Sequence, residues 1–413
     1  MMKRNLALTL FVVLSIVKVT SQDIDPNWGI KFTGFVKTDI FYDSRQSSTS
    51  NGVREGHYYL FPDNVLYDVS GNDINANPSL HMLSIQSRLV GKISGPDAFG
   101  ALTSGLIEAE FFGTSESDIN GFRLRQAYVK MDWTKTTLLI GQAWHPMFPV
   151  ESFPGTISFN TGAPFTPFSR NPQVRITQKL GESSISLSAY GQRDFSSPGP
   201  TGSGNKYLRN SVLPGLNMKL SAPSGDHFAG WAGVDYKTLR PELSTIANVE
   251  TNATIGSISA FATLKIKTTP LNLSLMGIYG QNAADLVMIG GYAVSGITDP
   301  VTQIKTYTNL NTANLWADLT TNGKKVVFGF FTGYSKNMGA SDLITGAVYG
   351  RGNNIDHVFR ASPRITVTEG RLTFATEVES TTAAYGTMQT NGKVTNTNNV
   401  TNLRVLFSTI YKF

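Results

Sequence analysis

The chain has 413 residues, a formal net charge of +6 and no cysteine. Without cysteine, a disulfide framework and an N-terminal lipid anchor on a thiol are both excluded. The modest charge comes without a polybasic run, which gives no indication of nucleic-acid binding. Abundant Phe, Tyr and Gly, with only 15% charged residues, are more typical of an exported all-β protein than of an α/β enzyme.

The first 21 residues predict a secretory signal peptide. A basic start is followed by the apolar stretch Leu6–Val17 and by the small residues Val19–Ser21. The apolar stretch is shorter than the ~20 residues that a membrane-spanning helix needs. We therefore expect residues 1–21 to be removed, which takes away three basic residues and no acid. Residues 22–413 are expected to form a single β-barrel.

From residue 30 onward, apolar and polar residues alternate in segments of roughly ten residues. In the first segment Ile30, Phe32 and Val36 share one face, and Lys31 and Lys37 share the other. A period of two predicts β-strands with one apolar face. The sixteen predicted strands cover residues 30–43, 79–93, 99–112, 121–132, 135–144, 172–180, 183–193, 211–221, 227–237, 255–267, 270–281, 312–321, 325–335, 354–367, 370–379 and 401–413.

The connections between these strands alternate in length. Tight turns such as Gly181-Glu182 and Asn322-Gly323 alternate with long segments such as 145–171 and 282–311, and only segment 113–120 breaks the pattern. Outer-membrane barrels combine short periplasmic turns, long outer loops and an even number of strands. A soluble sandwich gives no reason for this asymmetry. We predict an all-β fold, a 16-stranded antiparallel transmembrane β-barrel of the porin type in the bacterial outer membrane.

The segment His145–Arg170 (HPMFPVESFPGTISFNTGAPFTPFSR) is unlike a surface loop. It contains five Pro and five Phe but only two formal charges, and it is too rich in Pro for a helix or a strand. Because sixteen strands enclose a lumen too wide for wall side chains to fill, we predict that this third outer loop folds inward and narrows a pore. A proline-stiffened lid on a soluble β protein is the alternative. The predicted constriction residues are Phe148, Glu151, Phe153 and Arg170.

Several early segments resemble the DcaP-like porins: Ile30–Gln46, Ser87–Gly113, Phe122–Met131 and Leu138–Phe148. Beyond about residue 150 only the strand pattern and the closing aromatic residue agree with that family. The resemblance implies a trimeric outer-membrane channel that favours anionic solutes such as dicarboxylates. We therefore expect a homotrimer in outer-membrane lipid, small anionic solutes, no cofactor and no nucleic acid. The chain differs from some members in having no coiled-coil segment before the barrel.

Strand parity places an excess of basic side chains on the lumen face. A cleft lined by one sign of charge concentrates the opposite ion, and Arg suits carboxylates because it binds them with two parallel hydrogen bonds. Arg123 and Arg125 are the preferred solute contacts, although the alternation of their strand is imperfect. Glu108 and Glu110 lie between basic strands, so pairing across the wall explains any one residue equally well. The candidate pore-lining residues are Lys37, Arg88, Lys92, Glu108, Glu110, Arg123, Arg125, Arg175, Arg360, Arg364 and Arg404.

Other functions find less support in the sequence. The Asp and Asn residues of Asp68–Asn77 lack the spacing of a calcium loop, so no metal site is predicted. No phosphate-binding, dinucleotide, zinc-protease or serine-hydrolase motif occurs, which disfavours an enzyme. An energy-coupled transporter would need a plug domain, and Gln22–Gly29 is too short for one. The predicted function is passive diffusion of small hydrophilic, preferentially anionic solutes. The alternative is a structural or adhesive barrel with a plugged lumen and partner-binding outer loops.

Overall fold

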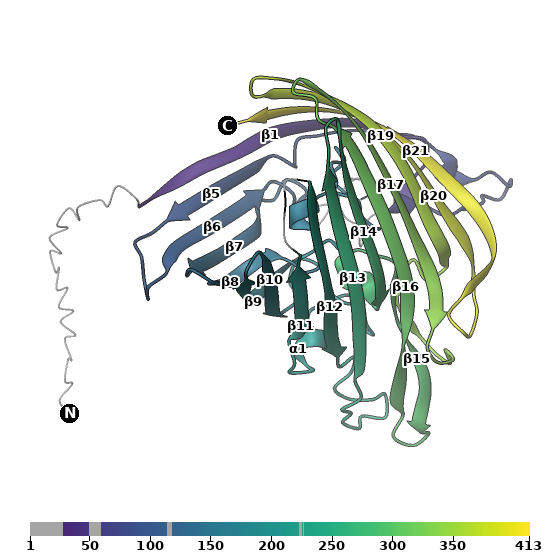
Figure 1. Ribbon diagram of the computed structural model, residues 1–413. Helices are drawn as coiled ribbons and strands as arrows, with labels where there is room; N and C mark the ends of the chain where they lie inside the picture. The colour runs from purple at the N-terminus through teal and green to yellow at the C-terminus, as the bar shows by residue number, and fades with distance from the viewer. Residues whose placement is uncertain (1–27, 49–58, 114–117, 223–224, 226) are drawn as a thin grey trace, which may run out of the picture.

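The strands of one antiparallel sheet close on themselves to form a barrel (Figure 1). The first strand, β1 (Gly29–Asp43), pairs with the last, β21 (Val394–Lys412), in a register that runs from Phe35↔Lys412 to Asp43↔Arg404. Closure leaves the barrel wall without an unpaired edge, which lipid could not satisfy. The predicted signal peptide lies outside the described residues. The computed structural model describes residues 28–48, 59–113, 118–222, 225 and 227–413.

In the described part of the chain the wall has sixteen strand positions, as predicted. One position is shared by β4 (Ser79–Leu83) and β5 (Arg88–Ser94), which pair with the two halves of β1. The other positions each hold one strand. These are β6 (Leu102–Glu110), β7 (Arg123–Asp132), β8 (Thr136–Trp144), β9 (Arg170–Leu180), β10 (Ser183–Tyr190), β11 (Gly215–Ser221), β12 (Phe228–Leu239), β13 (Ile255–Lys267), β14 (Leu271–Gln281), β16 (Ile304–Thr321), β17 (Val326–Ala340), β19 (Ile355–Glu369) and β20 (Leu372–Met388).

The remaining elements are short and lie in the connections. No helix among the described residues has the length and apolar character needed to cross a membrane. We refer to the end of the barrel with the tight turns as the turn end, and to the opposite end as the loop end. The short elements are β2 (Ser47–Ser48), β3 (Phe61–Pro62), β15 (Gly290–Asp299), β18 (Val348–Arg351), α1 (Lys206–Arg209) and the single-turn helices η2 (Ile74–Ala76), η4 (Val150–Ser152) and η5 (Ala283–Leu286).

Several predicted outer loops are partly strand. The prediction began β16 at residue 312 and β21 at residue 401, whereas these strands begin at Ile304 and Val394. β15 pairs with the added part of β16 and with β18, and β20 stays paired with β21 as far as Met388. These extensions carry many Thr and Asn residues on both faces. The backbone still pairs there, but the apolar alternation on which the prediction relied is missing.

The wall is apolar outside and polar inside. Ile30 and Phe32 on β1 are 57% and 60% exposed, whereas Lys37, Asp39 and Asp43 of opposite parity are buried. This arrangement is the reverse of that in a water-soluble protein. It matches a barrel whose outer surface meets hydrocarbon and whose charged groups face the lumen.

A β-bulge explains the imperfect alternation of β7. Glu108 on β6 pairs with Gln126, whereas the next residue, Ala109, pairs with Leu124, so Arg125 is the extra residue of the bulge. The side chain of Gln126 donates a hydrogen bond to Glu108, which faces the lumen. Arg125 is buried, and Leu124 is exposed on the outer surface. The bulge therefore turns both Arg125 and Gln126 inward.

The main apolar cluster lies inside the barrel and is built largely by loops. The inward loop, residues 145–169, enters the lumen as predicted and contributes Phe148, Phe165 and Phe168 to this cluster. Phe165 lies 6.1 Å from Phe331 of β17 between ring centres, on the far side of the lumen. A loop that starts at β8 therefore reaches a wall strand distant from it in the sheet order.

Two other loop segments join the same cluster, and the sequence did not single them out. Segment 59–62 belongs to the first outer loop, and segment 283–289 follows β14. The amide of Phe168 donates a 2.8 Å hydrogen bond to the carbonyl oxygen of Leu286, which joins the inward loop to the second segment. The prediction of one inward loop was correct, but among the described residues further loop segments enter the lumen, and Phe195 of the loop after β10 also joins the cluster.

Candidate functional site

The inward loop is fastened to the wall through its backbone. Gly155 donates a 3.0 Å hydrogen bond to Asp318 of β16, and the amide of Ile157 donates to Glu377 of β20. The amine of Lys37 donates to the carbonyl oxygen of Ile157 at 2.7 Å. Charged side chains of the wall thus satisfy the unpaired peptide groups that an irregular segment would otherwise bury. Lys37, predicted to line the pore, anchors the loop.

Three further predicted pore-lining arginines are buried against carboxylates. Arg364 makes two hydrogen bonds with Asp318, at 2.7 and 3.0 Å. Arg404 makes two with Asp43, at 2.9 and 2.7 Å. Arg360 donates to the carbonyl oxygen of Ala163 in the inward loop at 2.8 Å and lies 3.6 Å from Glu379. The geometry therefore favours a structural role for these arginines, in ion pairs and hydrogen bonds with the wall and the inward loop, over contact with a solute.

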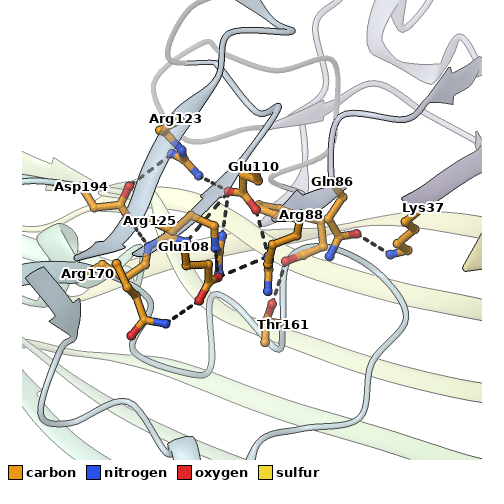
Figure 2. A network of polar contacts seen from close by, with 12 residues as sticks. Lys37, Gln86, Arg88, Glu108, Glu110, Arg123, Arg125, Thr161, Arg170 and Asp194 are labelled. Carbon is orange, nitrogen blue, oxygen red and sulfur yellow. Dashed lines mark hydrogen bonds and ion pairs between the residues drawn. The ribbon is translucent and has the colours of Figure 1, made fainter. Parts of the chain in front are cut away.

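A second charged cluster joins β5, β6 and β7 (Figure 2). Figure 2 shows Glu110 surrounded by guanidinium groups: Arg88 lies 3.1 Å away, Arg123 2.6 Å and Arg125 2.7 Å. Arg170 lies 4.0 Å from the same carboxylate. Because Glu110 is fully buried among these guanidinium groups, removing its carboxylate would leave buried arginines without their counter-charge. Arg123 and Arg125, the preferred solute contacts, therefore have their donors directed at carboxylates.

Asp194 completes this cluster from the loop that follows β10, and the sequence did not indicate it. Its carboxylate receives hydrogen bonds from Arg170 at 2.7 Å and from Arg123 at 3.2 Å. Burial alone would raise the pKa of Asp194, but the nearby guanidinium groups of Arg170 and Arg123 outweigh burial and hold that pKa below its ordinary value. The carboxylate is therefore ionised at neutral pH, as a partner of two arginines must be.

The four predicted constriction residues divide into two groups. Phe148 is buried and stacks on Trp144 with ring centres 3.9 Å apart, and Arg170 is buried in the cluster around Glu110. Glu151 and Phe153 are exposed. Only these last two belong to the solvent-accessible part of the inward loop. Phe148 and Arg170 hold the base of the loop in place.

A basic surface remains on β9, β11 and β13. Arg175 donates to the side-chain oxygen of Gln173 at 2.7 Å and to a backbone carbonyl, and it forms no ion pair among the residues that the structure describes. Lys219 lies 2.9 Å from Glu151, and the amine of Lys265 donates to the carbonyl oxygen of Glu151 at 3.4 Å. We call Arg175, Lys219 and Lys265 the basic triplet. Of these three residues, only Arg175 was among the predicted pore-lining residues.

Further lysines face the lumen near the turn end. Lys31 of β1 and Lys92 of β5 pair directly across the sheet, and both are exposed. Lys179 of β9 is likewise exposed. None of the three has an ion pair within the described ranges. Like charges directly opposite one another destabilise a sheet, so wall pairing does not account for Lys31 and Lys92.

His145 occupies the point where the inward loop leaves β8. Its Nδ1 accepts a 3.3 Å hydrogen bond from the amide of Met147, and its ring meets Tyr190 edge to face at 4.4 Å. Its Nε2 lies 3.9 Å from Asp235. Burial lowers the pKa of His145 well below its ordinary value, and the charges of Lys237 and Arg175 add to the effect. The imidazole is therefore neutral at pH 7. No cluster of potential metal ligands occurs among the described residues.

A closed sixteen-position barrel with an apolar exterior, a charged lumen and an inward third loop defines the porin fold. Comparison with solved structures agrees and identifies the DcaP-like form of this fold. The outer membrane channel DcaP of Acinetobacter baumannii matches with a TM-score of 0.70 at 18% identity, covering 94% of this chain and 98% of that one. The resemblance read from the early strands is thus confirmed for the fold.

Two further structures match over the same share of the chain. The anion-selective porin from Comamonas acidovorans has a TM-score of 0.56 at 9% identity and covers 94% of this chain and 100% of that one. OmpT of Vibrio cholerae has a TM-score of 0.55 at 10% identity and covers 94% and 98%. No protein-family model and no curated protein matches the sequence. At these identities the likeness concerns the fold.

Proposed function

We propose that the protein is a passive porin of the bacterial outer membrane, through which small hydrophilic solutes diffuse, anions in preference. Residues 1–21 act as the signal for export, and the turn end faces the periplasm. The porin fold and the apolar exterior support the location. Diffusion needs no energy source and no catalytic residue, so the protein acts as a channel and not as an enzyme.

The observation that carries the anion preference is the basic surface left over after pairing. The buried arginines are matched by carboxylates and contribute little net field. The basic triplet has only Glu151 beside it, and Lys31, Lys92 and Lys179 have no ion-paired acid in the described part of the chain. A lumen lined by cations raises the local concentration of anions. The carboxylate-bearing solutes implied by the resemblance to DcaP-like porins fit this surface.

The inward loop sets the width of the path. Its backbone is fixed to β16 and β20, and Phe148 fixes its base. Of the predicted constriction residues, Glu151 and Phe153 are the exposed ones. A loop held at this many points has a fixed position, which suits a pore of constant width. Its exposed residues then meet the solute, while the basic triplet attracts it.

A homotrimer is part of this proposal. β10 and β11 have eight and seven residues, fewer than the roughly nine to eleven of a strand that spans a bilayer. Figure 1 shows that the strands β8 to β11 are shorter than β16, β17, β19, β20 and β21 on the other side of the barrel. A neighbouring protomer in contact with this side would cover a part of the wall whose strands are too short to span the hydrocarbon core of the membrane. One solved structure of OmpT of Vibrio cholerae with this fold is described as a trimer form.

A second candidate is a structural or adhesive barrel with a closed lumen. Several inward loop segments and a large aromatic cluster inside the barrel favour it. In that case the long outer loops would bind partners and the lumen would conduct no ions. Conductance separates the two candidates directly.

The test is ion selectivity in planar bilayers, with purified full-length protein and its lumen variants. In a potassium chloride gradient, the wild-type reversal potential is expected to have the same sign as the chloride equilibrium potential. The double variant Lys31→Gln/Lys92→Gln should move the reversal potential toward zero. Lys325→Gln is the matched control, because Lys325 is an exposed lysine paired with Glu369 at a turn. Equal shifts in the double variant and the control would refute the assignment of lumen lysines to selectivity.

A further inference from the structure

We propose that Glu151 occupies the anion-binding position of the basic triplet and acts as a built-in competitor that a solute carboxylate must displace. The inference rests on the proposed function and assigns one specificity-determining residue within it. Glu151 would lower the affinity of the lumen for carboxylates and so favour their passage over their retention.

The first support is the position of the ion pair relative to the lumen. The carboxylate of Glu151 lies 2.9 Å from the amine of Lys219; the Lys219 side chain is 10% exposed and that of Glu151 is 42% exposed. The amine is therefore set into the wall, and the carboxylate covers it from the solvent side. A carboxylate arriving through the lumen would approach Lys219 at the place that Glu151 holds.

The second support is that the side chain can leave while the backbone stays. Glu151 lies in the single turn η4, between the stacked Phe148 and the anchored Gly155. Its neighbour Ser152 is fully buried. Displacement therefore needs only rotation of one partly exposed side chain, which is a fast motion compared with loop opening.

The third support is the charge that Glu151 leaves uncompensated. Arg175 donates to a side-chain amide oxygen and a backbone carbonyl, and Lys265 contacts only the backbone oxygen of Glu151 among the described residues. Three cations thus lie around Glu151, but only Lys219 forms an ion pair with its carboxylate among the described residues. When the Glu151 side chain rotates away, an entering carboxylate finds Lys219 within reach and a second cation beside it.

Other ion pairs of the lumen differ from this arrangement. Asp318 and Arg364 are both buried, and Asp318 also holds the inward loop. Lys130 and Asp132 form a partly exposed pair at 2.7 Å, with side chains 40% and 31% exposed. That pair has a similar chemistry, but Asp132 forms its ion pair with Lys130 and with no member of the basic triplet among the described residues. Asp132→Asn is therefore a matched control that removes one exposed, lysine-paired acid.

The experiment measures how free propionate, which reproduces the Glu151 side chain, blocks chloride current through the full-length protein in planar bilayers. In Glu151→Gln, the propionate concentration that halves the current should fall about twofold to fivefold, the range expected for losing one partly exposed ion pair. Asp132→Asn should leave that concentration unchanged, and propionamide should block neither variant. Equal values in wild type and Glu151→Gln, or equal decreases in both variants, would overturn the proposal.

A second variant separates occupancy of the position from net charge. Glu151→Asp keeps the negative charge but is one methylene shorter, so it should cover Lys219 less well and also lower the blocking concentration. If only the charge of the lumen mattered, Glu151→Asp would behave as wild type, and the proposal would be wrong. The wild-type reversal potential is recorded in the same bilayers. A cation-selective or silent wild type refutes the porin function itself, whereas an anion-selective wild type without an effect at Glu151 refutes only this inference.

Discussion

Asp318 joins the wall to the inward loop, and its replacement tests whether buried ion pairs hold that loop. Its carboxylate receives two hydrogen bonds from Arg364 and one from the amide of Gly155. Asp318→Asn keeps the size of the side chain but leaves the buried guanidinium without its counter-charge. Breaking a buried pair by removing one partner costs ~3–5 kcal/mol. We expect the free energy of unfolding to fall by about this amount.

The size of the effect can be isolated by a double-mutant cycle. Arg364→Met alone leaves Asp318 buried and unpaired, and should be destabilising to a similar degree. The double variant Asp318→Asn/Arg364→Met removes both charges, so it should be more stable than the sum of the single effects predicts. Glu369→Gln, in the exposed pair with Lys325, is the control and should have no measurable effect.

The assay is a urea titration of the refolded barrel, in which the folded fraction is followed by electrophoretic mobility without heating. The same variants are then examined in planar bilayers, where Asp318→Asn should widen the spread of single-channel conductance, because a single amide oxygen must then serve both Arg364 and Gly155 and holds the loop less firmly. Additive effects in the double variant would refute the reasoning. So would an Asp318→Asn barrel that is as stable as Glu369→Gln.

Three other predictions concern the loop and the wall. Gly333→Ala should destabilise the barrel by ~1–3 kcal/mol, since an added methyl carbon would lie 2.4 Å from the ring of Phe165. Gly277→Ala, where the nearest atom is 3.9 Å away, should be neutral in the same urea titration, and equal effects would contradict the packing argument. Glu110→Gln should lower the free energy of unfolding by ~3–5 kcal/mol, because four arginines lie around this buried carboxylate; a neutral result would mean that the arginines find other partners. His145 is kept neutral by burial, which depresses its folded-state pKa below the unfolded value of about 6.5. The stability that this neutral imidazole contributes is present above that unfolded value and is lost as the pH falls below it. Thermal unfolding at pH 7 and pH 5 should therefore show a smaller acid destabilisation in His145→Asn than in wild type, and equal pH dependence would exclude His145 as the cause.

The strands of this barrel could be predicted because lipid on one side and water on the other impose a period of two. Residues such as Ile30 and Phe32 mark the outer face, and each predicted strand is present in the wall. The inward loop was also predictable, because five Pro and five Phe residues suit neither a strand nor a solvated loop. The strand extensions beyond the apolar belt were not predicted, since Thr and Asn on both faces carry no alternation.

Pairing of Glu108 and Glu110 with the neighbouring basic strands was one of the two sequence interpretations, but the partners of the other charged residues could not be derived from the sequence. Arg123 and Arg125 have the lumen-facing parity expected from the sequence, whereas the bulge in β7 that also turns Gln126 toward Glu108 was visible only as an imperfect alternation. Asp194 reaches Arg170 from a separate loop. Lys219 and Lys265 lie in largely apolar or hydroxyl-rich strands, and their significance appears only when the loop brings Glu151 to them. Pairing depends on register and loop paths, which sequence periodicity does not determine.

The sign of the wild-type reversal potential tests the central claim most directly. Single channels of the purified protein are recorded between two potassium chloride solutions of different concentration. We predict steady conductance and a reversal potential with the sign of the chloride equilibrium potential. The basic surface that supports this prediction consists of Arg175, Lys219, Lys265, Lys31 and Lys92. A reversal potential on the potassium side, or a reconstituted and folded barrel that carries no current, would contradict the account.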